Sequence, residues 1–150
     1  MPMSKMQGEA AVILLVEDDP DHAKLIIRGL GNNRVAIQIH HVSDGEAGLD
    51  YLFRRGEYAD EEKSPRPHLI LLDLRLPRID GLEVLKEIKA DKELRRISVV
   101  VLTSSEAEND IARAGDNYAN SYLVKPAAFD DFRRMLRDLK FYWLVWNQHP

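Results

Sequence analysis

Short apolar runs that alternate with amphipathic stretches constrain the fold of this sequence more than any other feature. Strand-like runs occupy residues 12–16, 36–42, 69–72, 99–102 and 121–124. Between and after them, apolar residues recur at helical spacing in stretches that begin near Pro20, Gly45, Leu82, Ile111 and Phe129. A continuously apolar strand must be buried on both faces. Strands that are joined by helical crossovers, which are right-handed, run parallel to one another. The sequence therefore predicts an α/β fold with a five-stranded parallel sheet, doubly wound and flavodoxin-like, in strand order 2-1-3-4-5.

Length and composition fit one domain with a full hydrophobic core. The chain has 150 residues, of which 45% are hydrophobic and 31% charged. We expect a flexible leader over 1–10, a single domain over 11–140 and an aromatic extension over 141–150, with no separate output domain. Residues 54–68, which carry two prolines and many charges, predict an elaborated surface loop.

Several classes of protein are disfavoured by what the sequence lacks. No apolar run approaches the roughly 20 residues of a membrane span, so we expect no membrane partner. The first residues lack the apolar core of a secretory signal, and the absence of cysteine suits a reducing cytoplasm. The net charge is −4 and the basic pairs are dispersed among acids, which argues against nucleic acid as a partner.

Polar residues follow the predicted strands at one rim of the sheet. Glu17 and Asp18 follow the first strand, Asp73 the third, Thr103 the fourth and Lys125 the fifth. In parallel sheets, ligands bind at the carboxyl ends of the strands. Carboxylates gathered there would raise one another's pKa unless a cation lay among them, and oxygen ligands suit Mg²⁺. The sequence therefore predicts a hard-metal site at this rim.

A simpler interpretation treats each acid as a helix cap. Taken singly, any of these carboxylates could cap the helix that follows it. That interpretation leaves the whole group and the apolar-flanked Lys125 unexplained. Asp19 is the exception, because it directly precedes Pro20 at the start of a predicted helix, and we assign it to the cap.

Four strings in order resemble the CheY-like receiver domains of two-component response regulators. They are VEDD at 16–19, LLDLRLPRIDG at 71–81, VVVLTS at 99–104 and SYLVKP at 121–126. Asp73 precedes Thr103 by 30 residues and Thr103 precedes Lys125 by 22, which is similar to the usual receiver spacing. The resemblance covers the chain from about Ala11 to Leu139.

This resemblance implies a set of roles at the rim. Asp73 matches the phosphoacceptor, which takes a phosphoryl group from a histidine kinase to form an acyl phosphate. Glu17, Asp18 and Asp73, with the backbone carbonyl of Arg75, match the ligands of Mg²⁺ or Mn²⁺. Lys125 matches the lysine that pairs with the carboxylate and then with the phosphoryl oxygens. A cis peptide bond is expected before Pro126, where it would aim the lysine into the site.

The resemblance also implies a switch instead of an enzyme acting on other molecules. Thr103 and Tyr122 match the pair that responds to phosphorylation and remodels the fourth helix, the fifth strand and the last helix. Catalysis would be limited to the protein's own phosphorylation and dephosphorylation. A simpler interpretation makes Tyr122 an edge-strand aromatic half-buried against the fourth helix.

Some features point to a sub-family and others depart from the common pattern. The loop over 54–68 and the aromatic ending resemble single-domain regulators that pair with phytochrome-like sensor histidine kinases. Arg75 and Ser105 stand two residues after Asp73 and Thr103, where they flank the path of an attacking water. They leave the lifetime of the acyl phosphate open.

The end of the chain predicts an interface. Phe132, Leu136 and Leu139 form an apolar stripe that can cover one sheet face, but residues 141–146 are all large and apolar or aromatic. We expect an interface that uses Phe141, Tyr142, Trp143 and Trp146. A homodimer through the fourth helix, fifth strand and last helix is preferred, a kinase or output protein could use the same patch, and the alternative is a segment that folds back onto the domain.

Two other functions were weighed. A dehalogenase-like phosphatase also uses an aspartate and Mg²⁺, but needs a second aspartate where this chain has Arg75. A phosphorylation-independent adaptor would be expected to lack acidic, hydroxyl or lysine positions that are all present here.

Overall fold

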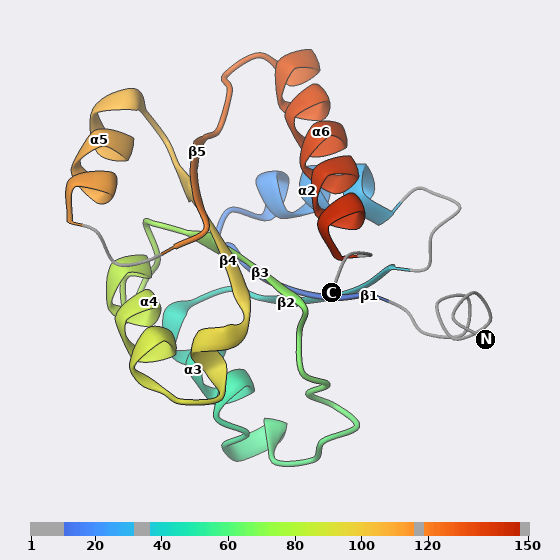
Figure 1. Cartoon of the computed structure of the whole chain (residues 1–150), viewed down its shortest axis with the longest axis vertical. Coiled ribbons are helices and arrows are strands. Elements are labelled where there is room, and N and C mark those ends of the chain that lie inside the picture. The colour runs from blue at the N-terminus through green and yellow to red at the C-terminus, as the bar shows by residue number, and fades with distance from the viewer. Residues whose placement is uncertain (1–10, 32–36, 116–118, 148–150) are drawn as a thin grey trace.

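The computed structural model describes residues 11–31, 37–115 and 119–147, with side chains as far as Phe141. Five strands form one sheet: β1 (Ala11–Val16), β2 (Ile37–Val42), β3 (Leu69–Asp73), β4 (Ser98–Thr103) and β5 (Ser121–Val124). Their spatial order is β2-β1-β3-β4-β5 and all four pairings are parallel, which confirms the predicted topology (Figure 1). The expected leader over 1–10 lies outside the described residues.

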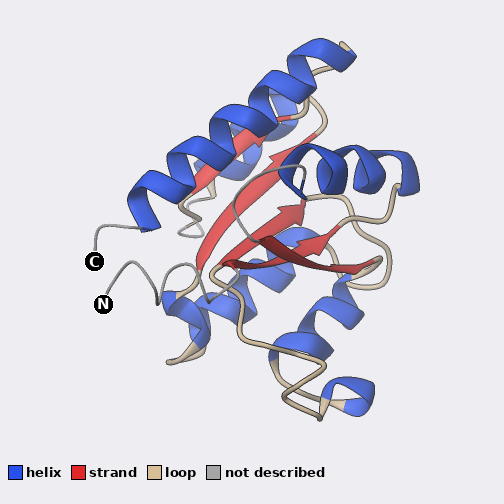
Figure 2. Ribbon diagram, turned by 90° about the vertical axis from the view of Figure 1, so that its right-hand side faces the viewer, coloured by secondary structure: helices blue, strands red, loops and turns tan. Residues whose placement is uncertain are grey.

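Helices cover both faces of the sheet (Figure 2). They are α2 (Pro20–Gly31), α3 (Gly45–Leu52), α4 (Gly81–Ala90), α5 (Glu106–Ala114) and α6 (Phe129–Asn147), with short 3₁₀ turns η1 (Gly56–Tyr58) and η2 (Leu94–Arg96). α2 and α6 lie together on one face, and α3, α4 and α5 lie on the other (Figure 1). No helix in the described parts of the chain is long and apolar enough to cross a membrane.

The continuous apolar strands produce two cores. Successive side chains of a strand point to opposite faces. Leu14 and Leu72 therefore pack beneath α3 and α4, whereas Ile13 and Leu71 pack beneath α2 and α6. All four side chains are at most 1% exposed, which is why these strands show no alternation of apolar and polar residues.

The segment over 54–68 is held firmly against α3. The Ser64 hydroxyl is buried and donates to the Tyr58 carbonyl at 2.8 Å. The Tyr51 hydroxyl donates to the Pro65 carbonyl at 2.7 Å, and burial raises the pKa of Tyr51 to about 12. The loop is thus an elaborated connection with its own polar anchors.

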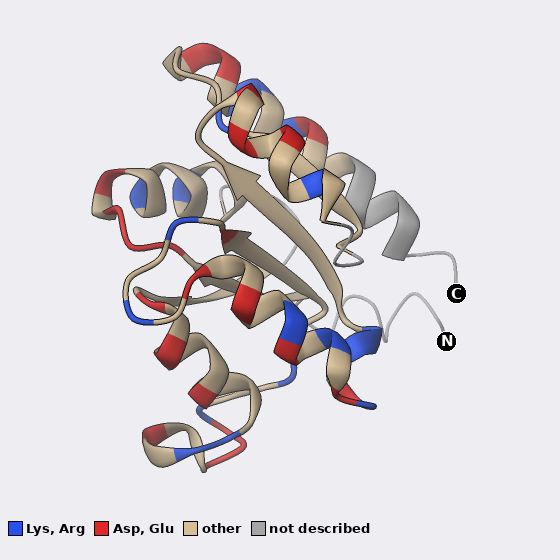
Figure 3. Ribbon diagram, turned by 90° about the vertical axis from the view of Figure 1, so that its left-hand side faces the viewer, with Lys and Arg blue, Asp and Glu red and all other residues tan. Residues whose placement is uncertain are grey.

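α6 packs its predicted stripe and then continues past the predicted domain boundary. Phe132, Leu136 and Leu139 are buried against the sheet and α2. Acidic and basic residues both occur at other positions along the described part of the helix (Figure 3). A Cβ on Gly29 of α2 would lie 2.9 Å from Leu136 Cδ1, so glycine permits this close packing. The helix runs without a break from Phe129 to Asn147, and Phe141 is 71% exposed. The side chains of Tyr142, Trp143 and Trp146 lie outside the described part.

Gly45 offers a test of the packing that supports the rim. A Cβ there would lie 1.9 Å from the Ile79 carbonyl oxygen, in the segment that joins β3 to α4. Gly45→Ala should therefore lower the free energy of unfolding by about 3 kcal/mol or more, measured by urea denaturation.

Gly31→Ala is the matched control, because a Cβ at this helical position meets no atom within 4 Å. Its free energy of unfolding should stay the same or rise by up to about 1 kcal/mol. Equal stabilities for the two variants would contradict the packing described here.

Candidate functional site

Four strands bring the predicted polar residues to one rim. Glu17 and Asp18 follow β1, Asp73 ends β3, Thr103 ends β4 and Lys125 follows β5. The Lys125 Nζ lies 2.5 Å from Glu17 Oε1 and 3.3 Å from Asp73 Oδ2. The Lys125 backbone N–H donates to the Thr103 carbonyl at 2.8 Å, which extends the sheet ladder into the site. The structure thus brings all five residues together.

Three carboxylates at the rim form a set that can hold a cation. One oxygen from each of Glu17, Asp18 and Asp73 lies within 4.8 Å of the others. Glu17 and Asp73 are buried and Asp18 is exposed, so the cluster is open on one side. The Lys125 ammonium pairs with Glu17 and Asp73 on the buried side of the cluster. Oxygen donors of this kind fit Mg²⁺ or Mn²⁺.

The environment of Asp73 disfavours its charged form. Burial is the largest cause, and the adjacent Glu17 carboxyl acts in the same direction. Lys125 opposes both effects, but the pKa of Asp73 is still raised to about 7. A cation beside the carboxylate would reverse this balance, since it favours the ionised form.

The chain turns sharply after Asp73. A Cβ at Gly81 would lie 2.4 Å from the Asp73 carbonyl oxygen and 2.8 Å from Leu74 Cα, so only glycine fits where α4 begins. Asp80 caps that helix by accepting hydrogen bonds from the N–H groups of Leu82 and Glu83. The direction of the Arg75 carbonyl toward the carboxylates stays a prediction.

Arg75 and Glu108 form an ion pair across the rim. The Arg75 guanidinium donates to Glu108 Oε2, while Glu108 Oε1 accepts from the Ser104 N–H at 3.0 Å. Burial favours the neutral acid, but these two partners outweigh it and lower the pKa of Glu108. The pair borders an open groove of about 550 Å³ that also touches Asp18 and Asp80.

Glu108 was not predicted as a site residue, although the sequence contains a motif that indicates where its side chain lies. Ser105 caps α5 and accepts from the Glu108 N–H at 3.1 Å, so Ser-x-x-Glu here has the sequence of a capping box, with the glutamate bonded one residue before the cap. The glutamate of such a box reaches back toward the residues before the helix. Here it bonds Ser104 and thereby places its second oxygen where Arg75 can reach it.

The Thr103 hydroxyl contacts a residue of α5. It lies 3.0 Å from Asn109 Oδ1 and 3.3 Å from the Leu123 carbonyl, and the side chains of Thr103 and Asn109 are both buried. Asn109 was also missed. Its signal is positional, since Asn109 and Ala112 are three residues apart on the buried side of an otherwise exposed helix.

Tyr122 is half-buried and packs against the core beneath α3 and α4. Its hydroxyl is enclosed but has no hydrogen-bond partner among the described residues. A buried polar group without a partner is unusual, because it forfeits its hydrogen bonds to water.

The expected cis bond before Pro126 is wrong. No cis peptide bond occurs among the described residues, which include Lys125 and Pro126. With this bond trans, the Lys125 backbone pairs with Thr103 and its ammonium reaches both Glu17 and Asp73. The lysine therefore needs no cis bond to be aimed into the site.

His22, which was not predicted as a site residue, also lies at the site. It stands in the first turn of α2, directly after the Asp19 cap that accepts from the N–H groups of Asp21 and His22. Its Nδ1 lies 3.2 Å from the Lys125 Nζ. Only the packing of α2 brings the two together, since they are 103 residues apart in the chain.

Known proteins are similar to this chain over nearly its whole length. The family model for the response regulator receiver domain matches residues 13–137. The probable methanogenesis regulatory protein FilR2 of Methanothrix harundinacea is 47% identical over 139 residues, covering 93% of this chain and 87% of the relative. The response regulator Rcp1 of Synechocystis is 41% identical over 142 residues, covering 95% of each chain.

Solved structures agree in sequence and in fold. The phosphorylated cyanobacterial phytochrome response regulator RcpA superimposes with a TM-score of 0.83 at 41% identity, covering 91% of this chain and 95% of RcpA. The Mn²⁺-bound form of Rcp1 gives a TM-score of 0.81 at 42% identity, covering 89% and 94%. With the family model, the similar sequences and the strand order in agreement, the chain belongs to the family of response regulator receiver domains.

Proposed function

We propose that Asp73 accepts a phosphoryl group from the phosphohistidine of a sensor histidine kinase and that the resulting acyl phosphate is the signalling state. The observation that carries this proposal is the Asp73 carboxylate itself. It lies at the carboxyl end of β3 within 4.8 Å of two other carboxylates and 3.3 Å from a buried ammonium. A carboxylate oxygen would attack phosphorus, the N–P bond would break, and the imidazole of the kinase would leave as a neutral ring after its nitrogen takes a proton from solvent.

Glu17, Asp18 and Asp73, with the Arg75 carbonyl, would hold Mg²⁺ or Mn²⁺. The bound cation would supply positive charge for the phosphoryl oxygens during transfer. Relatives support this assignment, since Rcp1 has been solved with Mn²⁺. Phosphoryl transfer depends mainly on positioning and charge, so few protein groups are needed beyond these.

Lys125 has the charge and reach to bind the incoming group. Its side chain is 6% exposed, so its attraction to an anion is weakly screened. Asp18 and Arg75 border the groove of about 550 Å³, which Leu74 also lines directly after Asp73, and we propose this groove as the route of the phosphodonor. Arg75 reaches from its own loop to Glu108 across this groove, so it lies on the path by which water would approach the acyl phosphate.

The switch would begin at Thr103. Its hydroxyl now bonds Asn109, and phosphoryl oxygens on Asp73 would be stronger acceptors. A rotation of Thr103 toward them would release Asn109 and open space beside Tyr122. The surface built by α5, β5 and α6 would change as a result, which is a shift between two populations of the same fold.

Other functions receive less support. In place of the second aspartate that a phosphatase of the dehalogenase type requires, this chain has Arg75, and the structure engages it with Glu108. A phosphorylation-independent adaptor would have no need of a buried lysine between two carboxylates, which is costly to desolvate. We therefore propose that the protein is a signalling switch. We also propose that it acts in the cytoplasm.

The kinase partner is proposed to be phytochrome-like. RcpA and two bacteriophytochrome response regulators are among the structural neighbours, at 40–41% identity. FilR2, at 47% identity, is a probable regulator of methanogenesis. A phosphotransfer experiment should therefore compare phytochrome-like kinases with kinases that act in the regulation of methanogenesis.

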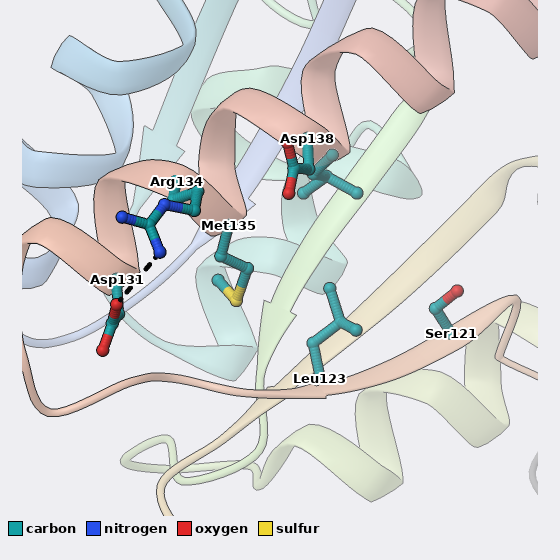
Figure 4. Close-up of a pocket in the computed structure, with 7 residues that line it drawn as sticks. Ser121, Leu123, Asp131, Arg134, Met135 and Asp138 are labelled. Carbon is teal, nitrogen blue, oxygen red and sulfur yellow. Dashed lines mark ion pairs between the residues drawn. The ribbon is translucent and has the colours of Figure 1, made fainter.

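The surface of α5, β5 and α6 is the proposed site of homodimerisation. A groove of about 490 Å³ runs between β5 and α6, and Met135 points across it toward Leu123 (Figure 4). Asp131 and Arg134 form an ion pair of 3.6 Å at its side. Phe141 lies further along the same helix and is exposed, which extends the apolar surface available to a second copy.

Phosphorylation at Asp73 is the first test of this function. Acetyl phosphate with Mg²⁺ should give an acid-stable, base-labile adduct at Asp73, detected by intact mass spectrometry. Asp73→Asn should not be labelled. Asp110→Asn, which alters an exposed carboxylate on α5, should be labelled as the natural chain is. Equal labelling of Asp73→Asn would reject the assignment.

Binding of Mg²⁺ should depend on pH. The metal needs the ionised carboxylate, and a pKa of about 7 for Asp73 leaves it ionised in about one molecule in eleven at pH 6 and about ten in eleven at pH 8. Affinity should therefore weaken as pH falls through 7, with a dissociation constant about tenfold larger at pH 6. Calorimetry in two buffers should show about one proton released per metal at pH 6.

Asp18→Ala tests the ligand assignment by the same titration. It should weaken Mg²⁺ binding at both pH values, whereas Lys125→Ala should leave binding largely intact. Equal affinity at pH 6 and pH 8 in the natural chain would mean that Asp73 is ionised throughout. Undiminished binding by Asp18→Ala would mean that the ligands are misassigned.

Dimerisation through α6 is tested by sedimentation with and without BeF₃⁻, a phosphoryl mimic. The full chain at tens of micromolar, roughly the range where an interface of about 8 kcal/mol is populated, should sediment as a dimer. A chain ending at Lys140, and Phe141→Ser, should shift toward monomer. Phe129→Ser is the control, because Phe129 is also exposed but begins the helix. A folded monomer for the full chain in both states would reject the homodimer.

A further inference from the structure

Among the described residues, three groups that can accept a hydrogen lie around the ammonium of Lys125, and one of them has no role in the proposed phosphorylation chemistry. Glu17 Oε1 lies 2.5 Å from Nζ, His22 Nδ1 3.2 Å and Asp73 Oδ2 3.3 Å. We infer that His22 is a positioning residue for Lys125, which holds the ammonium in place between Glu17 and Asp73. This inference rests on the proposed function, because it assigns His22 a part in placing the lysine that meets the phosphoryl group.

The three acceptors match the three donors of a lysine. An ammonium carries three N–H groups and no lone pair, so each of these neighbours can take one hydrogen. The Lys125 side chain is 6% exposed, so little water is at hand to replace a missing acceptor. A buried charge that loses a hydrogen bond pays the desolvation cost of that donor. His22 therefore completes the coordination of the ammonium.

The proposed role requires one tautomer of His22. To accept a hydrogen from Lys125, Nδ1 has to offer its lone pair, and the ring proton is then on Nε2. Asp19 Oδ2 lies 3.7 Å from the same Nδ1, which is beyond hydrogen-bond distance. The shorter contact is with Lys125, at 3.2 Å.

Two elements fix the place of the imidazole. The His22 backbone N–H donates to the Asp19 cap at 3.2 Å, which ties the residue to the first turn of α2. The ring packs beside Phe132 of α6, with centroids 6.0 Å apart and planes tilted by 54°. Phe132 is buried in the core, so it is itself held in place. The imidazole is thus positioned by α2 and α6 before any phosphodonor arrives.

The contact with Asp73 depends most on this arrangement. Glu17 makes the shortest of the three contacts and by itself would leave the ammonium free to rotate about that bond. A second fixed acceptor at His22 removes this freedom and keeps one N–H directed toward Asp73. Since the phosphoryl group arrives at Asp73, loss of His22 should slow transfer without changing how tightly the small phosphodonor binds.

The variants separate the acceptor from the shape of the ring. His22→Leu keeps much of the volume but has no acceptor. His22→Asn keeps an acceptor oxygen near the place of Nδ1. Asp21→Asn alters an exposed carboxylate in the same helical turn and serves as the control.

Phosphorylation by acetyl phosphate at saturating Mg²⁺ is the first readout. His22→Leu should lower the maximal rate constant by about five- to tenfold, with the half-saturating donor concentration unchanged within about twofold. His22→Asn should restore the rate to within about twofold of the natural chain, and Asp21→Asn should match it. An unchanged maximal rate in His22→Leu, or no rescue by His22→Asn, would overturn the positioning role.

The second readout needs no phosphorylation, which keeps this inference separate from the proposed function. In metal-free protein, the ammonium resonance of Lys125 is identified by ¹⁵N NMR through its loss in Lys125→Arg. Exchange of its protons with water should be at least about fivefold faster in His22→Leu and near natural in His22→Asn. Unchanged exchange in His22→Leu overturns the inference, whereas a natural chain that is never phosphorylated counts against the proposed function alone.

Discussion

The ammonium of Lys125, buried between the carboxylates of Glu17 and Asp73, is the interaction on which the rest of the site depends. It joins residues that follow or end β1, β3 and β5, so it spans most of the width of the sheet. Desolvating these charges costs free energy that their mutual attraction only partly returns. The raised pKa of Asp73 reports the same cost. A ligand that brings positive charge to Asp18 and Asp73 would offset this cost. The unfavourable burial of the carboxylates and their capacity to bind a cation therefore have the same cause.

The residues that the sequence predicted correctly and those it missed differ in how the fold positions them. Asp73 and Lys125 sit at strand ends, where the parallel topology alone decides that they share a rim. Their meeting follows from strand order, which the apolar runs reveal. Asn109, Glu108 and His22 reach the site from helices instead. Which side of a helix faces the rim depends on its rotation and on the packing beneath it, and this information is spread over the whole core.

The peptide bond before Pro126 shows another limit of reading a site from its sequence. A cis bond was expected from the resemblance to receiver domains, as a means of aiming the lysine into the site. The trans chain achieves the same result, since the Lys125 backbone stays in the ladder with Thr103 and its long side chain covers the remaining distance. Thr103 illustrates the reverse case, because its place was predictable but its partner was not. A hydroxyl rotates to suit its neighbours, and here the neighbour is Asn109.

The unbroken course of α6 has a mechanical consequence. Its 19 residues span about 28 Å at 1.5 Å per residue, and its buried stripe ends at Leu139, the eleventh residue of the helix. The helix continues for about 12 Å beyond Leu139 and carries the exposed Phe141 there. A tilt of about 5° about Leu139 would move the end of the helix by about 1 Å on this length. A rearrangement at β5 too small to disturb the core would in this way be amplified at the distal end of the helix.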